Sequence, residues 1–477
     1  MSRFHVVTVG WPKVLIEELC PDIAARSGMQ FSHIAHPRVC ASDGPRGTPG
    51  NAVHFFRDEP AQELPPAEPA FLATLEQSGV PTIHNMILGD RVVCRLAYAE
   101  AQRYATFIAK RLSELFAAMR PSAVIGGYDA LHGSLALAVA RRMNLPWFAL
   151  HFAPIPPGLA CFCDRMSPAA RVQLAPRARA ELLALAESSL RQFEQRAIQA
   201  PAYIAPPRSL ARTVSKLPSR VASIVRVFRK GREREFAQFV DTPGRYDVPA
   251  ALRQLWRLSR AGKALERANA LAAPPGAPYV LFGLHKQPES TIDVWAPFFS
   301  NQMWVIELLS RSIPPSHRLL VKIHKSDISK YPQALLDRMR SFPGVELVRP
   351  FADTRQFIEQ AGLVIAIQGT MGLEAALLGR PVIMLGESPV SVFPSASTAG
   401  ALPDLPALVR AKLRERPPGR DAIVDAYATY LAPFWPASRS YWRVRKSDAE
   451  VENYVGLFNA LRAYLAGSAG VSTGTGQ

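Results

Sequence analysis

The chain has 477 residues, 48% of them hydrophobic and 20% charged, which allows two or three globular domains with buried cores and excludes a disordered chain. Lysine and arginine total 56 against 39 aspartate and glutamate, and the net charge of +17 favours nucleic acid, an anionic lipid surface or a phosphorylated substrate. The five irregularly spaced cysteines exclude a disulfide framework and indicate a reducing compartment. The sequence shows no signal-like segment and no run near 18 apolar residues, so we expect neither secretion nor a membrane-spanning helix.

The first part of the chain predicts an α/β sheet of the doubly wound kind. Short apolar runs bounded by turn residues predict strands over 4–9, 31–34, 123–125 and 147–150. Between them, helical spacing predicts helices over 13–25, 71–77, 98–119 and 132–143. The Pro-rich and Gly-rich segment 37–69 is predicted to be irregular.

The segment 156–275 is helical in pattern, basic and interrupted by proline, and it ends in the linker-like stretch "LAAPPGAP". Between Arg208 and Arg232 it holds eight basic residues and no acid. On a helix starting near Ser219, one face carries Phe228 and other apolar residues, while the opposite face carries Arg226, Arg229 and Lys230. This pattern is typical of a helix in a membrane interface. The alternative is a helix that packs on its own protein and keeps its basic face in water.

A second sheet is predicted after this insertion. Apolar runs predict strands over 279–282, 319–323, 345–348, 363–367 and 382–385. Helices are predicted over 302–310, 332–341, 354–360 and 373–378. After residues 405–414 the chain becomes aromatic-rich and helical, and it ends in a Gly-rich and Ser-rich tail. The predicted fold class is therefore α/β, with two Rossmann-like domains. The predicted domains are 1–155, the basic insertion 156–275, a nucleotide-binding domain 276–415, and C-terminal helices with a disordered tail over 416–477.

The stretch "QGTMG" breaks the apolar run that ends at Ile367. A turn at this place lies at the carboxyl end of a strand, where open α/β sheets bind ligands. Gly369, Thr370 and Gly372 would offer backbone amides, a hydroxyl group and a helix start to a phosphate. Glu374 is predicted in the first helical turn, where an acid also complements the helix dipole. An ordinary acid at a helix start is the alternative for Glu374.

Two further pairs of polar residues follow predicted strands. Lys322 and His324 flank Ile323, so both should point to the same face at the end of their strand. A cation beside an imidazole suits a phosphate leaving group. Gln287 and Glu289 follow the first strand of the second sheet and are predicted donor-site residues. The alternatives are a surface lysine, a hydrogen-bonded histidine and a loop without function.

The N-terminal domain is expected to present the acceptor and a catalytic base. Asp129 and His132 follow a predicted strand, and Asp90 precedes a basic residue. Gly10, in the turn after the first strand, would admit close approach of a ligand. Helix capping is the alternative role for Asp129.

Several other chemistries lack their motifs. There is no Gly-x-Ser-x-Gly elbow, no Walker-type Gly-Lys-Ser/Thr and no His-Glu-x-x-His, and no full dinucleotide fingerprint follows a strand. We therefore expect no metal and no cofactor beyond a co-substrate. Nucleic-acid binding is not expected either, because the basic run contains Phe228 as its one aromatic residue.

Three segments occur together in the second sheet: "LHKQPESTID" with "FFSNQMWVIELLSRSIP", then "LLVKIHKSD", then "IQGTMGLEAALLGRPVIMLGE". In this order and approximate spacing they resemble the capsular polysaccharide synthesis family of bacterial glycosyltransferases, over roughly residues 279–387. The resemblance implies GT-B architecture, with two Rossmann-like domains facing a cleft and the donor held mainly by the C-terminal one. It also implies that Glu374 accepts hydrogen bonds from the donor ribose. Family members usually carry His-Pro where this chain has His324-Lys325.

The predicted function is transfer of a sugar from a nucleotide-activated donor to a lipid-linked or growing surface polysaccharide, without a metal. The resemblance makes CMP-Kdo one candidate donor, and it implies work at the cytoplasmic face of the bacterial inner membrane, attached to its anionic surface. Two alternatives stay open. One is a CDP-glycerol-type polyol phosphotransferase, and the other is a non-catalytic factor in capsule assembly.

Overall fold

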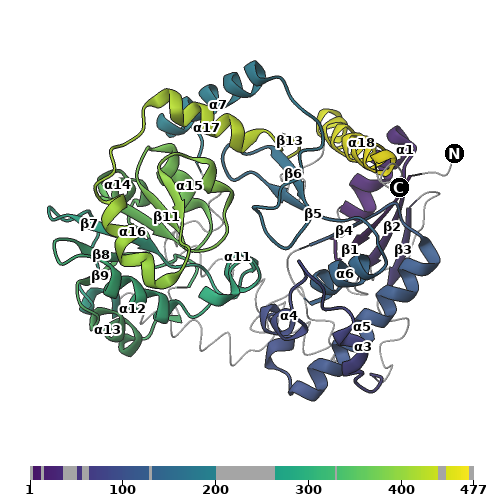
Figure 1. The fold of residues 1–477 in the computed structure, drawn as a ribbon, viewed down its shortest axis with the longest axis horizontal. Coiled ribbons are helices and arrows are strands. Elements are labelled where there is room, and N and C mark those ends of the chain that lie inside the picture. The colour runs from purple at the N-terminus through teal and green to yellow at the C-terminus, as the bar shows by residue number, and fades with distance from the viewer. Residues whose placement is uncertain are drawn as a thin grey trace, which may run out of the picture. The chain divides into compact units, whose positions relative to one another are not determined.

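A computed structural model of the chain divides into two compact units (Figure 1). Unit 1 comprises Met1–Ile198 and Ala428–Gln477, and unit 2 comprises Gln199–Tyr427. The structure describes residues 4–11, 15–35, 51–55, 64–127, 131–199, 264–327, 330–438 and 447–471.

Unit 1 is built on a seven-stranded sheet in the order β13-β6-β5-β4-β1-β2-β3. The five strands from β3 to β5 in this order are parallel, which is the doubly wound arrangement expected from the sequence. Two antiparallel strands extend the β5 edge. The strands are β1 (His5–Val9), β2 (Gln30–Ala35), β3 (Asn51–Phe55), β4 (Ala123–Gly126), β5 (Trp147–Phe152), β6 (Leu159–Cys163) and β13 (Trp435–Pro436).

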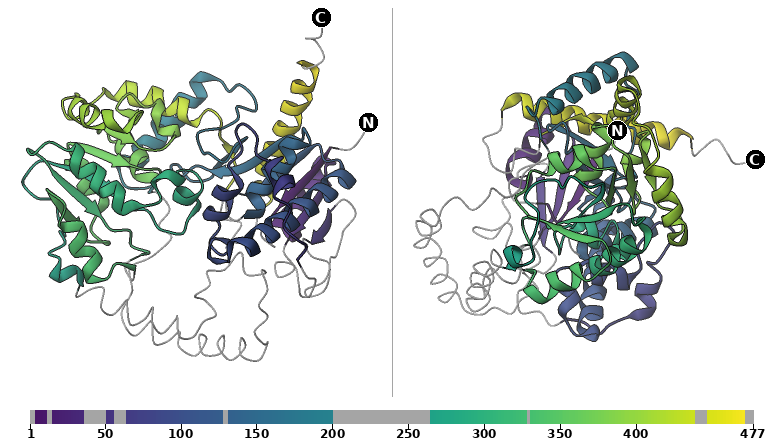
Figure 2. Two further views of the ribbon diagram at one scale, coloured as in Figure 1. Left: turned by 60° about the horizontal axis from the view of Figure 1, so that its bottom comes forward. Right: turned by 90° about the vertical axis from the view of Figure 1, so that its left-hand side faces the viewer.

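The helices of unit 1 come from both ends of the chain. The C-terminal helix α18 packs beside α1 (Figure 1), and the left view of Figure 2 shows this yellow helix projecting from unit 1. Phe458 of α18 joins the sheet core in edge contacts with the rings of Phe31 and Phe162. The helical elements are η1 (Leu15–Leu19), α1 (Cys20–Ser27), α3 (Pro69–Ala73), α4 (Ile83–Gly89), η2 (Val93–Arg95), α5 (Tyr98–Met119), α6 (Leu131–Arg142), α7 (Arg179–Glu194) and α18 (Asp448–Val471).

The segment predicted as the start of a helical insertion differs in the structure. Leu159–Cys163 forms the fully buried strand β6, which pairs antiparallel with β5. The prolines in the turn between the two strands are the reason that the sequence pattern did not predict this hairpin. The C-terminal segment closes the same edge, since the Arg171 guanidinium lies 4.4 Å from the Tyr430 ring centroid and donates to the Tyr430 carbonyl oxygen at 2.7 Å. Unit 1 continues to Ile198 and resumes at Ala428, and the four-part domain division stays a prediction.

Unit 2 contains a six-stranded sheet in the order β12-β11-β10-β7-β8-β9, all parallel. This order places the first strand in the centre, as in dinucleotide-binding folds. The short edge strand β12 was not predicted, because its three residues carry no apolar pattern. The strands are β7 (Tyr279–Gly283), β8 (Arg318–Lys322), β9 (Val345–Val348), β10 (Leu363–Ala366), β11 (Val382–Met384) and β12 (Ala396–Thr398).

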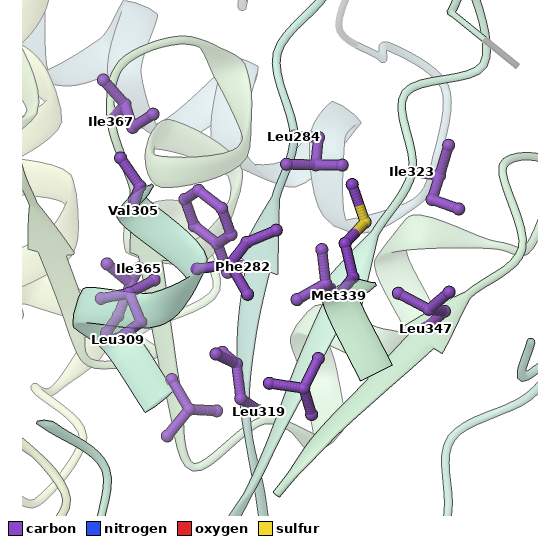
Figure 3. Close-up of a cluster of buried hydrophobic side chains, with 14 of the residues drawn as sticks. Phe282, Leu284, Val305, Leu309, Leu319, Ile323, Met339, Leu347, Ile365 and Ile367 are labelled. Atoms are coloured by element: carbon purple, nitrogen blue, oxygen red, sulfur yellow. The ribbon is translucent and has the colours of Figure 1, made fainter. Parts of the chain in front are cut away.

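Alternation along the unit 2 strands assigns their side chains to two faces. One face packs against α12 and α13, and Figure 3 shows Phe282 and Ile365 of the sheet among Val305, Leu309 and Met339 of these helices. The helices are α11 (Ser290–Asp293), η5 (Pro297–Phe299), α12 (Gln302–Ser312), α13 (Gln333–Arg340), α14 (Thr354–Gln360), α15 (Thr370–Leu377), η7 (Pro389–Val392), η8 (Leu402–Asp404), α16 (Leu405–Lys412) and α17 (Arg420–Leu431). The boundary between the units falls inside α17.

The predicted α/β class with two Rossmann-like sheets is confirmed, and antiparallel strands occur only at the β5 edge of the unit 1 sheet among the described strands. The described part of the chain contains no helix with both the length and the apolar composition that crossing a bilayer requires.

Candidate active site

The carboxyl ends of β7 and β10 meet where the strand order of unit 2 reverses. From β7 the chain adds β8 and β9 on one side, and it then returns to place β10 on the other side. Ligands of open α/β sheets bind just beyond the strand ends at such a reversal. His285 follows β7 and Gly369 follows β10, and a Cβ atom on Gly369 would lie 3.1 Å from His285 Cε1. The two segments are therefore in contact at the expected ligand position.

Gly369 caps the N-terminus of α15 with a φ of 86°, a left-handed conformation that glycine adopts at little cost. The helix begins at Thr370, three residues before the predicted start at Leu373. One reason is packing, because the missing side chain of Gly283 on β7 leaves space for Met371 in the first turn.

This early start moves two predicted residues. Gly372 lies inside α15 rather than in the turn, and a Cβ atom there would lie 2.5 Å from Met384 Sδ. Its role in the structure is thus close packing of α15 on β11. Glu374 lies in the second helical turn, so the prediction that it occupies the first turn is wrong.

The carboxyl group of Glu374 accepts a hydrogen bond from the Thr370 side chain. Burial raises the pKa of Glu374 to about 7, and this outweighs the lowering effects of Thr370, Arg355 and Lys325. A carboxyl group with a pKa shifted by burial at the edge of a sheet is a candidate functional group. Near neutral pH it can switch between accepting and donating hydrogen bonds.

Lys322 lies at the end of β8 and turns toward backbone atoms. Its Nζ donates to the carbonyl oxygens of Arg349 at 3.1 Å and Pro350 at 3.0 Å, and the residue is only 6% exposed. Burial lowers the pKa of Lys322 to about 8, and the charge of Lys325 lowers it further. The ammonium group thus ties β8 to the chain that follows β9.

His324 presents one ring nitrogen that has no partner among the described residues. The backbone N–H of Ser326 donates to Nδ1 at 3.2 Å, so the neutral ring carries its proton on Nε2. Burial lowers the pKa of His324; Asp327 opposes this effect, while three nearby lysine side chains add to it. At neutral pH the ring is therefore an uncharged N–H donor.

His285 is a candidate that the sequence analysis missed. The backbone N–H of Gln368 donates to His285 Nε2 at 3.4 Å, which leaves the proton of the neutral ring on Nδ1. Burial lowers the pKa of His285 to about 4, and the charge of His324 lowers it further. The sequence feature that could have identified His285 is its position two residues after Gly283, on the side of the strand that faces α15.

The loop after β7 is held by its own side chains. The backbone N–H of Gln287 donates to Asp327 Oδ2 at 2.8 Å, and its side-chain Nε2 donates to Asp293 Oδ1 at 2.7 Å. The backbone N–H of Glu289, which caps α11, donates to Asp293 Oδ2 at 2.8 Å. The amide group of Gln287 therefore shapes the loop through contacts with protein atoms.

The reversal point of the unit 1 sheet lies between β1 and β4, and it brings Gly10 against His132. Gly10 has a φ of 70°, and a Cβ atom there would lie 2.3 Å from His132 Nε2. The predicted close approach at Gly10 is thus made by a side chain of the protein. His132, in the first turn of α6, lies at the strand-end edge where the sequence analysis expected it.

Asp90 holds backbone groups in unit 1. Its Oδ1 accepts from the N–H groups of Val92 at 2.8 Å and Val93 at 2.9 Å, and its Oδ2 accepts from that of Leu131 at 2.7 Å. The residue is 2% exposed. These are the contacts of a buried cap that fixes the start of α6.

Asp129 and the predicted membrane residues Arg226, Phe228, Arg229 and Lys230 lie outside the described residues. Within the described ranges, no three His, Cys, Asp or Glu side chains gather closely enough to hold a metal ion. Metal independence stays a prediction.

Residues 242–395 match the family model described as "Capsule polysaccharide biosynthesis protein". The segment is thus similar to the proteins of this family. It includes β7 to β11 and thus every candidate of unit 2 from His285 to Glu374. The resemblance found in the sequence is thereby confirmed for the capsule-biosynthesis segment.

No curated protein matches the chain. Solved structures similar to it include KpsC of Thermosulfurimonas dismutans, a β-Kdo 2,4-transferase, at 15% identity and a TM-score of 0.38, covering 70% of this chain and 87% of that one. Another is the UDP-GlcNAc 2-epimerase of Neisseria meningitidis, at 13% identity and a TM-score of 0.30, covering 90% and 97%. At these scores the capsule-biosynthesis assignment depends on the family model alone.

Proposed function

We propose that the protein is a glycosyltransferase that moves a sugar from a nucleotide-activated donor to a lipid-linked or growing surface polysaccharide. The observation that supports this most lies within the capsule-biosynthesis segment: the Gly369 turn and Glu374 follow β10 at the strand reversal of unit 2, and His324 follows β8, the strand next to β7. Departure of the nucleotide leaves a phosphate anion, which helix N-termini and side-chain N–H donors stabilise.

Each group takes a distinct part in donor binding. The backbone amides at the start of α15 face the phosphate, and the Nε2–H of His324 donates to it. Glu374, as a carboxylate, accepts hydrogen bonds from the ribose hydroxyl groups. These hydrogen bonds stabilise its charged form. The reaction needs no resident cofactor or metal in this proposal.

The acceptor is assigned to unit 1. His132 is the described candidate there, since it lies beside Gly10 at the strand reversal. Asp129, which precedes it by three residues, is the candidate base. The carboxylate of Asp90 is occupied by three backbone N–H groups, so in this proposal it positions α6.

We expect Glu374→Ala to weaken nucleotide binding by about 1 to 3 kcal/mol, because a buried hydrogen-bond acceptor is lost. Isothermal titration with CMP, CDP, UDP and GDP measures this and also identifies the donor nucleotide. Because ribose binding requires the ionised carboxyl group, whose pKa in the free protein is about 7, affinity should rise by up to about tenfold from pH 6 to pH 8. Glu374→Gln should remove this pH dependence.

The conservative variant Glu307→Gln on α12 is a control, because that carboxylate pairs with Arg311 on the same helix at 2.7 Å. Unchanged affinity in folded Glu374→Ala would refute the ribose assignment. A donor screen separates sugar transfer from the transfer of a polyol phosphate. A folded protein that binds none of the nucleotides, yet stays on membranes, would instead be a non-catalytic assembly factor.

We also propose attachment to the anionic cytoplasmic face of the inner membrane through the basic run 208–232. Each lysine or arginine near an anionic surface contributes on the order of 1 kcal/mol, which fades beyond a Debye length. The protein should sediment with anionic but not neutral liposomes, and raised salt should release it. Changing Arg226, Arg229 and Lys230 to glutamate should abolish sedimentation. If the folded triple variant sediments like the original, the run does not carry the attachment.

A further inference from the structure

Two lysines follow the central strands of unit 2, Lys286 after β7 and Lys325 after β8. The β7 and β8 ladder pairs Gly283 with Lys322 and continues with a hydrogen bond from Leu284 N to Lys322 O of 2.9 Å. Continued in register, the two chains bring His285 beside His324 and Lys286 beside Lys325.

The two chains stay tied beyond these residues as well. The backbone N–H of Gln287 donates to Asp327 Oδ2 at 2.8 Å, and Lys330 bridges the same carboxylate and the Gln287 carbonyl oxygen. Hydrogen bonds between the two segments therefore lie both before and after Lys286 and Lys325. The charges of both lysines lower the pKa of His324, as expected for cations near its ring.

Neither lysine forms an ion pair or a hydrogen bond with any residue that the structure describes, and both are half-buried. The neighbouring acids are occupied. Asp327 accepts from Gln287 and pairs with Lys330 at 2.9 Å, Asp353 accepts from the Arg355 N–H at 3.0 Å, and Glu374 accepts from Thr370. Two lysines without an ion pair in the described structure thus lie near two neutral imidazole N–H donors, and Lys325 acts on Glu374 through its charge alone.

We propose that Lys286 and Lys325 form a diphosphate subsite, so that the donor is a nucleoside diphosphate compound rather than a nucleoside monophosphate compound. This rests on the proposed nucleotide binding at the same strand reversal. A sugar phosphodiester carries one negative charge, whereas a sugar diphosphate carries two and matches the two lysines. The His285 and His324 N–H groups complete the donors to the phosphate oxygens.

The test compares each nucleoside monophosphate with its diphosphate by isothermal titration, using CMP and CDP, UMP and UDP, and GMP and GDP. For the base that binds best, the wild-type protein should bind the diphosphate at least about tenfold more tightly. Lys286→Gln and Lys325→Gln should each lower this preference by about threefold to tenfold, and the double variant should remove it. Affinity for the monophosphate should change by less than about threefold in each case.

Arg338→Gln on α13 is the matched control, since it removes one exposed cation from the same unit, and it should leave the preference unchanged. Thermal unfolding of each variant shows whether unit 2 is intact. Binding of a monophosphate with equal affinity, or a preference that survives the double variant, overturns the diphosphate subsite while leaving nucleotide binding in place. Failure of all six nucleotides to bind overturns the proposed function and the subsite together.

Discussion

Replacing His324 with alanine should lower turnover by about 10²-fold to 10³-fold, the effect of removing one preorganised donor to a developing anion. The Ser326 N–H fixes the ring with its proton on Nε2, and burial with three nearby lysines keeps its pKa low and the ring neutral. The melting temperature should change by no more than about 2 °C, because one hydrogen bond and part of a half-buried ring are lost. Initial rates with the identified donor, beside thermal unfolding, measure both quantities.

His317→Ala is the matched control for this experiment. His317 belongs to the same unit but directly precedes β8, at the amino end of this strand, whereas His324 follows its carboxyl end. Its removal should leave turnover unchanged. Normal activity in folded His324→Ala rules out a role at the donor phosphate, and an equal loss in both variants would point to a general effect on unit 2.

Gly133→Ala should destabilise unit 1 by about 3 kcal/mol or more. A Cβ atom on Gly133 in α6 would lie 2.5 Å from the carbonyl oxygen of Gly127, at the end of β4. This obstacle is a backbone atom, which cannot rotate away as a side chain can, so α6 must shift from the sheet. Overpacking of this kind costs 1 to 3 kcal/mol or more, which corresponds to a fall in melting temperature of roughly 6 to 12 °C for a unit of this size.

Gly127→Ala provides the comparison, because a Cβ atom there meets nothing within 4 Å. We expect its stability to lie within about 0.5 kcal/mol of the wild type. Chemical denaturation followed by circular dichroism measures both variants. If Gly133→Ala unfolds at the same denaturant concentration as Gly127→Ala, the close contact between α6 and β4 is absent in solution.

Elements with strong periodicity were predicted well. Helices Tyr98–Met119 and Thr354–Gln360 have the predicted bounds, and the strands of unit 2 differ from prediction by a residue or so at their ends. Elements without such a signal were missed. Strand β3 falls in the segment predicted to be irregular, and β6 follows a proline-rich turn. Strand β3 pairs parallel with β2, and β6 pairs antiparallel with β5. This pairing stabilises the two strands more than local propensity does.

Residue types and strand ends were enough to select the region of the candidate site, but not the direction of each side chain. Lys322 and His324 share a strand face by alternation, yet Lys322 turns to two backbone carbonyl groups while His324 keeps an N–H without a partner in the described structure. Gly372 was expected in a phosphate turn and packs against Met384 instead. Such differences arise from neighbours that are remote in sequence.

The sequence by itself determined the α/β class, two sheets with parallel strands, and the family resemblance over roughly residues 279–387, because these follow from local periodicity and from short motifs along the chain. Only the tertiary structure decided which polar groups are engaged. Asp90 is occupied by Leu131, 41 residues away, and His285 became a candidate only when the strand order brought Gln368 to its ring. Hydrogen bonding and desolvation depend on what packs around a group, and that is set by strand order and helix contact rather than by neighbours along the chain.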